Sequence, residues 1–474
     1  MQTPETYDLV VVGCGAAALS AAVTYSEDAA DRGESPRIAV LERATRDDRG
    51  GASRWTGAMF RVDAEGRLDP AFSAFMAEVS GGRADAETCR VLTAEAPTTI
   101  ALLREAGVQL VEVPREAATA APGYLVPIGG GEAIVNALAA RVEAAKGAEI
   151  LYETEATELV ADADGRVCGV RVRDGDGADR ELRAQAVVLA CGGFEGNPEL
   201  LREHVDARAD RLGLIAPGLA NNRGDGIRMA TAIGADTAGD FAGIHSELVD
   251  TRTTKPDAAI LGHTLGIVVN HQGERFYDEG RAPLDATFEL IALDVWREQG
   301  QHAYFITDEA FMSRLQFPEL TYLSDQPPVT ADTTEELASK LGLDPAALRS
   351  TVEAFNAACD PDTPLDLLRP DGKATRGIEP PKSNWANPIA HPPFRAYPVT
   401  TVITFTYGGL RADTSGRVLT PAGEPIPGLY AAGELVGLYW HEYPAGTQVL
   451  RALTWGRLAA RHAAATRATG AVVS

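Results

Sequence analysis

A glycine-rich turn directly after a short apolar run constrains this chain more than any other feature. Residues 7–12 read YDLVVV, the continuous apolar pattern of a buried parallel strand, and the turn GCGAAA at 13–18 follows at once. A second apolar run, RIAVL at 37–41, ends in Glu42. The order of strand, GxGxxA turn, helix, strand and acidic residue predicts the first βαβ unit of a Rossmann-type dinucleotide-binding domain.

Each residue type in this unit has a physical reason. Gly13 makes the tight turn, Gly15 lets a pyrophosphate approach the backbone, and Ala18 keeps the helix close to the strand. The free N–H groups at the start of the helix favour the pyrophosphate there. Glu42 is expected to accept hydrogen bonds from the adenosine ribose.

Local patterns along the chain predict an α/β protein. The helix after the turn is expected to reach about residue 25, and the polar residues 26–36 are expected to connect it to the next strand. A glycine triplet, Gly129 to Gly131, has no strand before it and is expected to open a plain helix. Other expected elements are a helix over 86–106, a meander around 151–182, a buried strand at 186–190, a strand and turn at 428–434 and a closing helix over 450–462.

Composition excludes several functional classes. The 474 residues, 45% of them hydrophobic, are enough for two or three packed cores. A formal net charge of −24 opposes binding to nucleic acid or to an anionic membrane surface. The five cysteines form no CxxC pair, so we expect no metal and an organic cofactor for any redox chemistry. The apolar run at 9–12 is too short to span a membrane, and we expect a cytoplasmic enzyme without membrane insertion.

Four later segments carry a family resemblance. They are RGGAS at 49–53, ACGGFEGNP at 190–198, NRGDG at 222–226 and GLYAAGE at 428–434. Together with the GxGxxA turn, the dinucleotide-binding fingerprint at 13–18, they resemble the fumarate reductase/succinate dehydrogenase flavoprotein family over nearly the whole chain. The RGGAS segment and the chain length are most similar to its FAD-dependent tricarballylate dehydrogenase branch.

The resemblance implies a fold and a cofactor. The expected fold class is α/β, a Rossmann-type FAD-binding domain with an inserted α+β capping domain that takes the substrate. We expect the FAD-binding domain to comprise residues 1–238 and 384–474, and the capping domain residues 239–383. Members with covalent FAD use a histidine near the segment that reads RWT at 54–56 here, so we expect non-covalent FAD.

The resemblance also assigns cofactor contacts. Gly50, Gly51 and Ser53 would line the flavin, and Glu434 would bind the ribityl region. Asp225 and Gly226 would lie near the pyrophosphate and the flavin ring. Val449 and Leu450 would lie at a helix start that is directed at the flavin pyrimidine, where negative charge develops on reduction.

Four residues are candidates for the reaction, which in this family is dehydrogenation of a C–C bond beside a carbonyl or carboxylate, or its reverse. His245 matches the substrate-binding histidine of the family. Arg281, displaced in a simple alignment, follows the GERFYDE turn at 273–279 and would be the proton shuttle. Alternative interpretations are a capping histidine and a solvated arginine.

At two positions this sequence lacks the residue with which fumarate reductases bind a carboxylate group of their dicarboxylate substrate. The segment FTYGG at 405–409 lacks the histidine of fumarate reductases, and Tyr443 stands where they have a carboxylate-binding arginine. The YPAG segment at 443–446 resembles 3-ketosteroid dehydrogenases, which implies that Tyr443 donates a hydrogen bond to a ketone oxygen. Core packing is the alternative for Tyr443, and His441 is a further candidate.

Three functions therefore compete. The leading hypothesis is an FAD-dependent dehydrogenase or reductase acting on CH–CH groups of a carboxylated small molecule, as in tricarballylate dehydrogenase. The alternative is a desaturase of a larger, more apolar ketone. A third possibility, of another class, is an electron-transfer flavoprotein without its own substrate. The sequence leaves the external electron acceptor or donor open.

Overall fold

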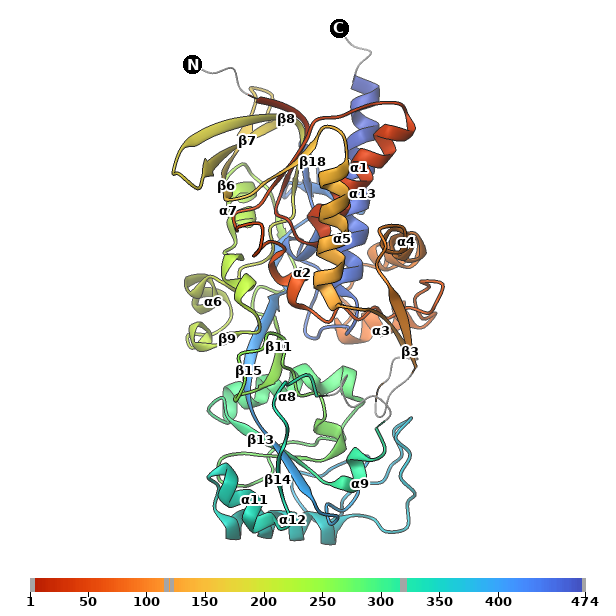
Figure 1. The fold of residues 1–474 in the computed structure, drawn as a ribbon, viewed down its shortest axis with the longest axis vertical. Helices are drawn as coiled ribbons and strands as arrows, with labels where there is room; N and C mark the ends of the chain where they lie inside the picture. The colour runs from red at the N-terminus through yellow and green to blue at the C-terminus, as the bar shows by residue number, and fades with distance from the viewer. Residues whose placement is uncertain (1–4, 115–118, 120–122, 316–321, 471–474) are drawn as a thin grey trace. The chain divides into compact units, whose positions relative to one another are not determined.

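The chain divides into two compact units. The computed structural model describes residues 5–114, 119, 123–315 and 322–470. Unit 1 comprises Met1–Glu112, Tyr124–Ile244 and Thr404–Ser474, and unit 2 comprises Val113–Gly123 and His245–Ile403. Figure 1 shows the helices and strands of both. The chain passes between the units inside two strands, β11 (Ile244–Asp250) and β15 (Phe394–Thr406), whereas the sequence-based limits are 238/239 and 383/384.

The centre of unit 1 is a largely parallel sheet. Its order is β17-β18-β8-β1-β2-β5, with β1 (Glu5–Val12) between β8 and β2. Val10 and Val11 of β1 are fully buried, as expected of a strand covered on both faces. The other strands are β2 (Ile38–Leu41), β5 (Ala148–Leu151), β8 (Asp179–Leu189), β17 (Arg417–Leu419) and β18 (Pro425–Ala431).

A meander extends this sheet. β6 (Thr154–Ala161) pairs antiparallel with β7 (Val167–Asp174), and β7 pairs antiparallel with β8. β8 also runs parallel to β1 along its length. The meander expected from the sequence is confirmed for β6 to β8, and β8 joins it to the parallel sheet. Leu151, where the meander was expected to begin, lies instead in β5, which pairs parallel with β2.

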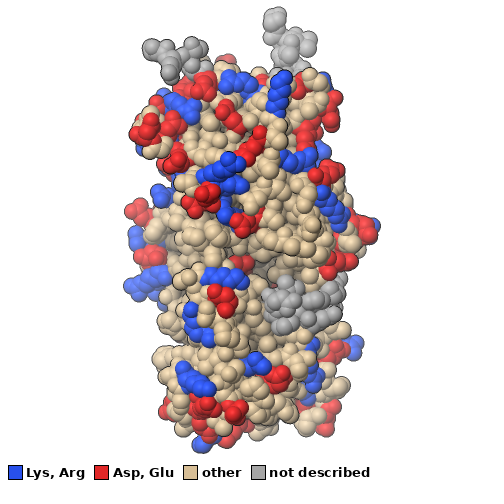
Figure 2. All heavy atoms as spheres, in the orientation of Figure 1, with Lys and Arg blue, Asp and Glu red and all other residues tan. Residues whose placement is uncertain are grey.

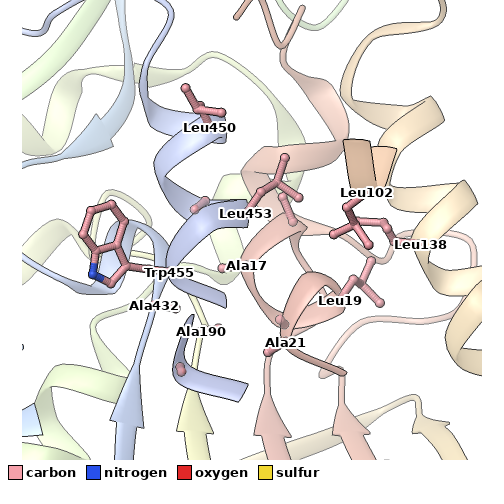
Figure 3. Close-up of a cluster of buried hydrophobic side chains, with 14 of the residues drawn as sticks. Ala17, Leu19, Ala21, Leu102, Leu138, Ala190, Ala432, Leu450, Leu453 and Trp455 are labelled. Carbon is pink, nitrogen blue, oxygen red and sulfur yellow. The ribbon is translucent and has the colours of Figure 1, made fainter. Parts of the chain in front are cut away.

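Helices of small residues pack beside the parallel strands. α1 (Ala16–Asp31) lies against α13 (Gln448–Gly470), and small and apolar side chains fill the space between them (Figure 3). A Cβ on Gly456 of α13 would lie 2.2 Å from the carbonyl oxygen of Ala17, so this contact requires glycine. Other helices of unit 1 are α2 (Gly51–Trp55), α3 (Phe72–Val79), α4 (Ala86–Glu105), α5 (Gly130–Ala144), α6 (Pro198–His204) and α7 (Asp225–Thr231).

The expected end of α1 at about residue 25 was wrong. The helix continues to Asp31 through residues that look like a polar connection in the sequence. Ser26 and Ala29 are buried, and Glu27 forms an ion pair with Arg141 of α5. Packing against neighbouring helices therefore extends α1 beyond its apolar pattern.

Short elements complete unit 1 and its borders. They are β3 (Leu110–Pro114), β4 (Gly123–Pro127), β9 (Gly213–Leu214), β10 (Thr237–Ala238), β16 (Gly409–Leu410) and the 3₁₀ turns at Ala209–Arg211, Pro217–Asn221 and Gly433–Leu435.

Unit 2 is an α+β structure around its own sheet. The strands follow the order β11-β15-β13-β12, and β14 (Val329–Ala331) also pairs with β15. Its remaining elements are β12 (Ile267–Val269), β13 (Ala303–Thr307), α8 (Leu284–Glu298), α9 (Glu309–Met312), α11 (Thr334–Leu341), α12 (Pro345–Ala358) and a 3₁₀ turn at His263–Leu265. The mixed α/β fold class expected from the sequence is confirmed.

Candidate cofactor and substrate site

The turn after β1 has the geometry that its glycines predict. Gly13 has a φ of 109°, in the left-handed region, and a Cβ there would lie 2.3 Å from the carbonyl oxygen of Ala190. A Cβ on Gly15 would come no closer than 3.1 Å to its nearest neighbour, the Oγ of Ser53. Ala18 is fully buried between helix and strand. The contact of a Cβ at Gly15 with Ser53 would be tight, so the turn favours a residue without a side chain at Gly15, which leaves the bare backbone that a pyrophosphate can approach.

The RGGAS segment brings a hydroxyl to the start of α1. Gly50 and Gly51 have φ angles of 107° and 51°, and they begin α2. Ser53 then accepts a hydrogen bond from the backbone N–H of Ala16 at 3.0 Å. A Cβ on Gly131 would lie 1.9 Å from the carbonyl oxygen of Ser53, so the expected helix start at the glycine triplet also makes close contact with α2.

Glu42 is a buried carboxylate held by backbone donors. It accepts hydrogen bonds from the N–H groups of Ala44 at 2.9 Å and Gly50 at 3.3 Å. Burial raises the pKa of Glu42, and the backbone donors act in the opposite direction. A carboxylate has about four acceptor positions, so Glu42 retains capacity for ribose hydroxyls.

Asp225 belongs to an ion-pair network with Arg43, the residue that follows Glu42. Its carboxylate accepts from Arg43 at 2.8 Å and from Arg228 at 3.3 Å. Arg43 also bonds Glu155 of β6 at 2.6 Å. A Cβ on Gly226 would lie 2.7 Å from the Sγ of Cys191, which places the start of α7 directly against the turn after β8. Arg43 thus fixes Asp225 and joins three elements around the loop that begins at Glu42.

A cavity of about 620 Å³ opens next to the same loop. Its lining includes Thr45, Trp55, Pro217 and Asn221, together with the Arg43 network. Acidic and basic side chains alternate over the face shown in Figure 2, with no extended basic region among the residues coloured there. The cavity and the Glu42 loop together suit the polar, sugar-bearing part of a dinucleotide better than an extended polyanion.

Glu434 is the second buried carboxyl group at the expected cofactor site. It lies in the 3₁₀ turn after β18 and accepts from the backbone N–H of Thr406 at 3.0 Å and from the Thr406 hydroxyl at 3.2 Å. Glu195, from the GGFEGNP segment, interacts with it and is 1% exposed. The sequence analysis missed Glu195, because a glutamate in a glycine-rich turn usually indicates a solvated residue.

The start of α13 carries the polar groups expected near a flavin. The hydroxyl of Tyr443 accepts hydrogen bonds from the backbone N–H groups of Thr447 at 3.1 Å and Gln448 at 3.0 Å. The Oε1 atom of Gln448 is buried and has no hydrogen-bond partner among the described residues. Val449 is partly buried, and Leu450 is fully buried in the core, so only the backbone of Leu450 is suited to a cofactor contact.

Tyr443 belongs to an aromatic cluster in unit 1. Its ring meets Phe405 edge-on at 5.0 Å and Tyr439 at 5.4 Å between ring centroids, and Phe405 also contacts Tyr407. Burial raises the pKa of Tyr443, which keeps the phenol protonated and able to donate a hydrogen bond at neutral pH. His441 is exposed, with a φ of 61°.

His245 and Arg281 lie in unit 2. His245 is 2% exposed, with Nδ1 2.5 Å from Glu289 and Nε2 3.2 Å from Glu247. Burial disfavours the imidazolium, but the two carboxylates outweigh it and raise the pKa of His245 to about 9. Arg281 is exposed, and its guanidinium lies 6.0 Å from the ring centroid of Tyr277. In unit 1, Tyr443 contacts the start of α13 through the N–H groups of Thr447 and Gln448.

Comparison with known proteins identifies the family. The FAD binding domain family matches residues 8–450, nearly the whole chain. The chain belongs to this family of FAD-dependent oxidoreductases.

Its relatives in this family include both reductases and dehydrogenases. NADH:fumarate oxidoreductase of Klebsiella pneumoniae (strain 342) is 27% identical over 98% of this chain, and the chain spans 48% of that protein, about half its length. A 3-oxosteroid 1-dehydrogenase of Mycolicibacterium smegmatis is 32% identical over 72% of this chain and 63% of that protein. The crystal structure of 3-ketosteroid-Δ4-(5α)-dehydrogenase from Rhodococcus jostii RHA1 is 27% identical, covers 98% of both chains and has a TM-score of 0.71.

The residues present fit FAD. Gly15 leaves the backbone at the start of α1 without a side chain, Glu42 keeps acceptor capacity, and Gln448 has a buried oxygen without a hydrogen-bond partner among the described residues at the start of α13. These three features match the pyrophosphate, ribose and flavin ends of the cofactor in turn. Non-covalent attachment and the individual contacts stay predictions. Among the described residues, no helix is long and apolar enough to cross a membrane, and no three His, Cys, Asp or Glu side chains are grouped to hold a metal ion.

Proposed function

We propose that this oxidoreductase dehydrogenates a larger, apolar ketone at the C–C bond beside its carbonyl, or catalyses the reverse reduction. The observation that supports this most is the position of Tyr443, whose hydroxyl is held by two backbone N–H groups at the start of α13. Bound FAD would accept or supply the hydride of such a reaction.

Tyr443 is the residue that would act on the carbonyl. A phenol that accepts two backbone N–H donors is fixed in orientation, and the donors increase the acidity of its own hydrogen. Donation to a ketone oxygen stabilises the negative charge that develops there when the α-proton is removed. The start of α13 adds the positive end of the helix dipole to the same region.

The surroundings of Tyr443 favour an apolar substrate over a dicarboxylate. Phe405 and Tyr439 contact its ring, and Tyr407 belongs to the same cluster. The guanidinium of Arg451, over the Tyr439 ring, donates to the carbonyl oxygens of Gly433 and Val436. This cation is therefore engaged with the backbone rather than offered to a substrate carboxylate.

His245 is also poorly suited to bind an anionic substrate. Both of its ring nitrogens have carboxylate partners, so the group formed by His245, Glu247 and Glu289 carries more negative than positive charge. A substrate carboxylate beside this group would be repelled. The roles of Arg281 in proton transfer and of His441 stay proposals.

A substrate screen tests the proposal. Under anaerobic conditions, the bleaching of the flavin by saturated cyclic ketones and the reoxidation of reduced flavin by enones would be followed in a stopped-flow spectrophotometer. We expect ketones or enones to react and di- and tricarboxylates to leave the flavin unchanged. Reaction with carboxylates alone would overturn the ketone proposal.

The second candidate is the carboxylated substrate first expected from the sequence, resembling tricarballylate. The match to NADH:fumarate oxidoreductase over 98% of this chain favours it. In the same screen, this candidate predicts turnover that weakens with added salt, because its substrates bind through charge. Reaction with neither class would favour the third hypothesis, an electron-transfer flavoprotein without its own substrate. An external electron acceptor or donor and a cytoplasmic location are parts of the proposal that need separate tests.

A further inference from the structure

The turn after β8 buries a carboxyl group that the proposed function does not use. Glu195 is 1% exposed, and its Oε1 accepts a hydrogen bond from the side chain of Asn222 at 2.6 Å. Its Oε2 is also buried, and no N–H or O–H group of the described residues donates to it. An ionised carboxylate in this position would leave one buried oxygen without a donor, which is costly.

The group that interacts with Glu195 is a second carboxyl. Glu434 comes from the turn after β18, and Thr406 of β15 donates to it from both its N–H and its hydroxyl. A Cβ on Gly193 would lie 2.1 Å from Oε1 of Glu434. The missing side chain of Gly193 is therefore what allows Glu434 to reach the turn that carries Glu195.

We propose that Glu195 and Glu434 share one proton, and that this shared proton holds Glu434 in the orientation that binds the ribityl region of FAD. Glu195 is then a positioning residue that acts through Glu434. The proposal depends on FAD binding by unit 1 and not on which substrate the enzyme takes. Its consequence is that FAD affinity falls as the pair loses its proton.

Electrostatics agree with a protonated Glu195. Burial and the neighbouring charge of Glu434 raise the pKa of Glu195 well above 4.5, and burial also raises the pKa of Glu434. The pKa of Glu434 is raised less strongly, because Glu195 and Thr406 stabilise its ionised form by hydrogen bonds. The proton therefore resides on Glu195, which donates to the carboxylate of Glu434.

The direction of the pH effect follows from the raised pKa. When the folded pKa is higher than the unfolded one, the favourable interaction is complete below pH 4.5 or so and is lost as pH rises through the folded pKa. Above that pKa, two buried negative charges face each other. Retention of FAD should therefore weaken with rising pH, and not with falling pH.

The cation that interacts with the pair in the described part of unit 1 is Arg451 of α13, which attracts the charge of Glu434. Its guanidinium donates its hydrogen bonds to the carbonyl oxygens of Gly433 and Val436 rather than to the carboxyl groups. The other titratable or charged groups packed around the two turns are Cys191 at the end of β8, the Arg43–Asp225 ion pair at α7, and His204 of α6, whose ring contacts Phe194.

The test is the dissociation constant of FAD as a function of pH. FAD fluorescence would give the Kd for the wild type, Glu195→Gln and the matched control Glu199→Gln, whose glutamate is exposed on α6. We expect the wild-type Kd to rise about tenfold per pH unit above the pKa of the pair, since one proton is released. In Glu195→Gln, the amide donates to Glu434 without a titrating proton, so the Kd should be nearly independent of pH. The control should follow the wild type.

An infrared measurement gives an independent result even if Glu195→Gln does not fold. The wild-type holoprotein at neutral pH should show the C=O band of a protonated carboxyl group that disappears at alkaline pH together with FAD affinity. Absence of that band, a pH-independent wild-type Kd, or an unchanged pH slope in a folded Glu195→Gln variant would each overturn the proposal. Because none of these readouts involves a substrate, their outcome is independent of the substrate screen.

Discussion

Two buried carboxylates of unit 1 and two of unit 2 are held in different ways. In unit 1, Glu42 and Glu434 are held by backbone N–H and hydroxyl donors. In unit 2, Glu279 is paired with Arg275 at 2.5 Å, and Asp250 with Arg252 at 2.7 Å. A carboxylate that accepts only from neutral donors keeps its full charge and some free acceptor positions. A side-chain cation in close contact compensates the charge and occupies those positions.

This difference distinguishes carboxylates that are suited to bind the cofactor from carboxylates that are suited to stabilise the fold. Glu42 and Glu434, which face neutral donors, keep acceptor capacity for the cofactor contacts that the sequence predicts. Asp225, which the sequence also predicts to lie at the cofactor, is paired with Arg43. The ion pairs of unit 2 are suited to fixing its fold. Changes in the first group should therefore alter FAD affinity, and changes in the second should alter stability.

The largest effect is expected at the turn of unit 1. Gly15→Asp would place a carboxylate where the pyrophosphate approaches the backbone, so we expect complete loss of FAD binding. The flavin absorbance of the purified protein measures this directly. Gly165→Asp is the control, because Gly165 also lies in a turn, where a Cβ would meet nothing within 4 Å and where its left-handed φ of 79° is one that Asp adopts more readily than most residues. Full flavin occupancy in Gly15→Asp would show that the fingerprint is misplaced.

The next effect concerns the stability of unit 2. Glu279→Gln leaves the guanidinium of Arg275, 4% exposed, without its charge partner. Loss of one partner of a buried ion pair costs about 3–5 kcal/mol, so the free energy of unfolding should fall by that order. Chemical denaturation measures it, with the exposed Glu274→Gln as the control. A large rise in the Kd of FAD without loss of stability would contradict the comparison.

Tyr443 tests the chemistry of unit 1. Loss of a hydrogen bond made to the developing oxyanion lowers turnover by about a hundredfold or more, roughly 2.7–4 kcal/mol. We expect Tyr443→Phe to reduce the rate of flavin reduction by about that factor while the flavin spectrum stays unchanged. Tyr430→Phe is a control in the same unit. If the phenylalanine variant reacts normally and Tyr443→Ala only loses stability, Tyr443 has a packing role.

The smallest effect is expected for the ribose carboxylate. Glu42→Gln keeps the shape of the side chain but replaces a charged acceptor by a neutral one, which weakens each hydrogen bond from the ribose. We expect the Kd of FAD to rise about tenfold, or roughly 1.4 kcal/mol, with little change in stability. Fluorescence titration would compare it with the exposed Glu34→Gln. An unchanged Kd would mean that Glu42 only organises its own loop.

The sequence was sufficient where function depends on local geometry. Gly13 and Gly15 have the turn that their spacing predicts, and Ser53 lies at the start of α1. The sequence was insufficient where the surroundings of a residue consist of segments that are distant along the chain. Glu195 is buried because Glu434 and Asn222 enclose it from other parts of the chain. α1 continues to Asp31 for the same kind of reason, since its last turns pack against α5.

The pairing of β11 with β15 has a consequence for how this protein can be rebuilt. The N–H of Thr251 bonds the carbonyl of Pro398, and the N–H of Tyr407 bonds that of Gly243, so the first and last strands of unit 2 are antiparallel neighbours. A segment whose two ends are adjacent can be removed as an insertion, because a short loop can then join the remaining chain ends. Replacement of residues 245–403 by such a loop would leave every strand of the parallel sheet in unit 1 uninterrupted.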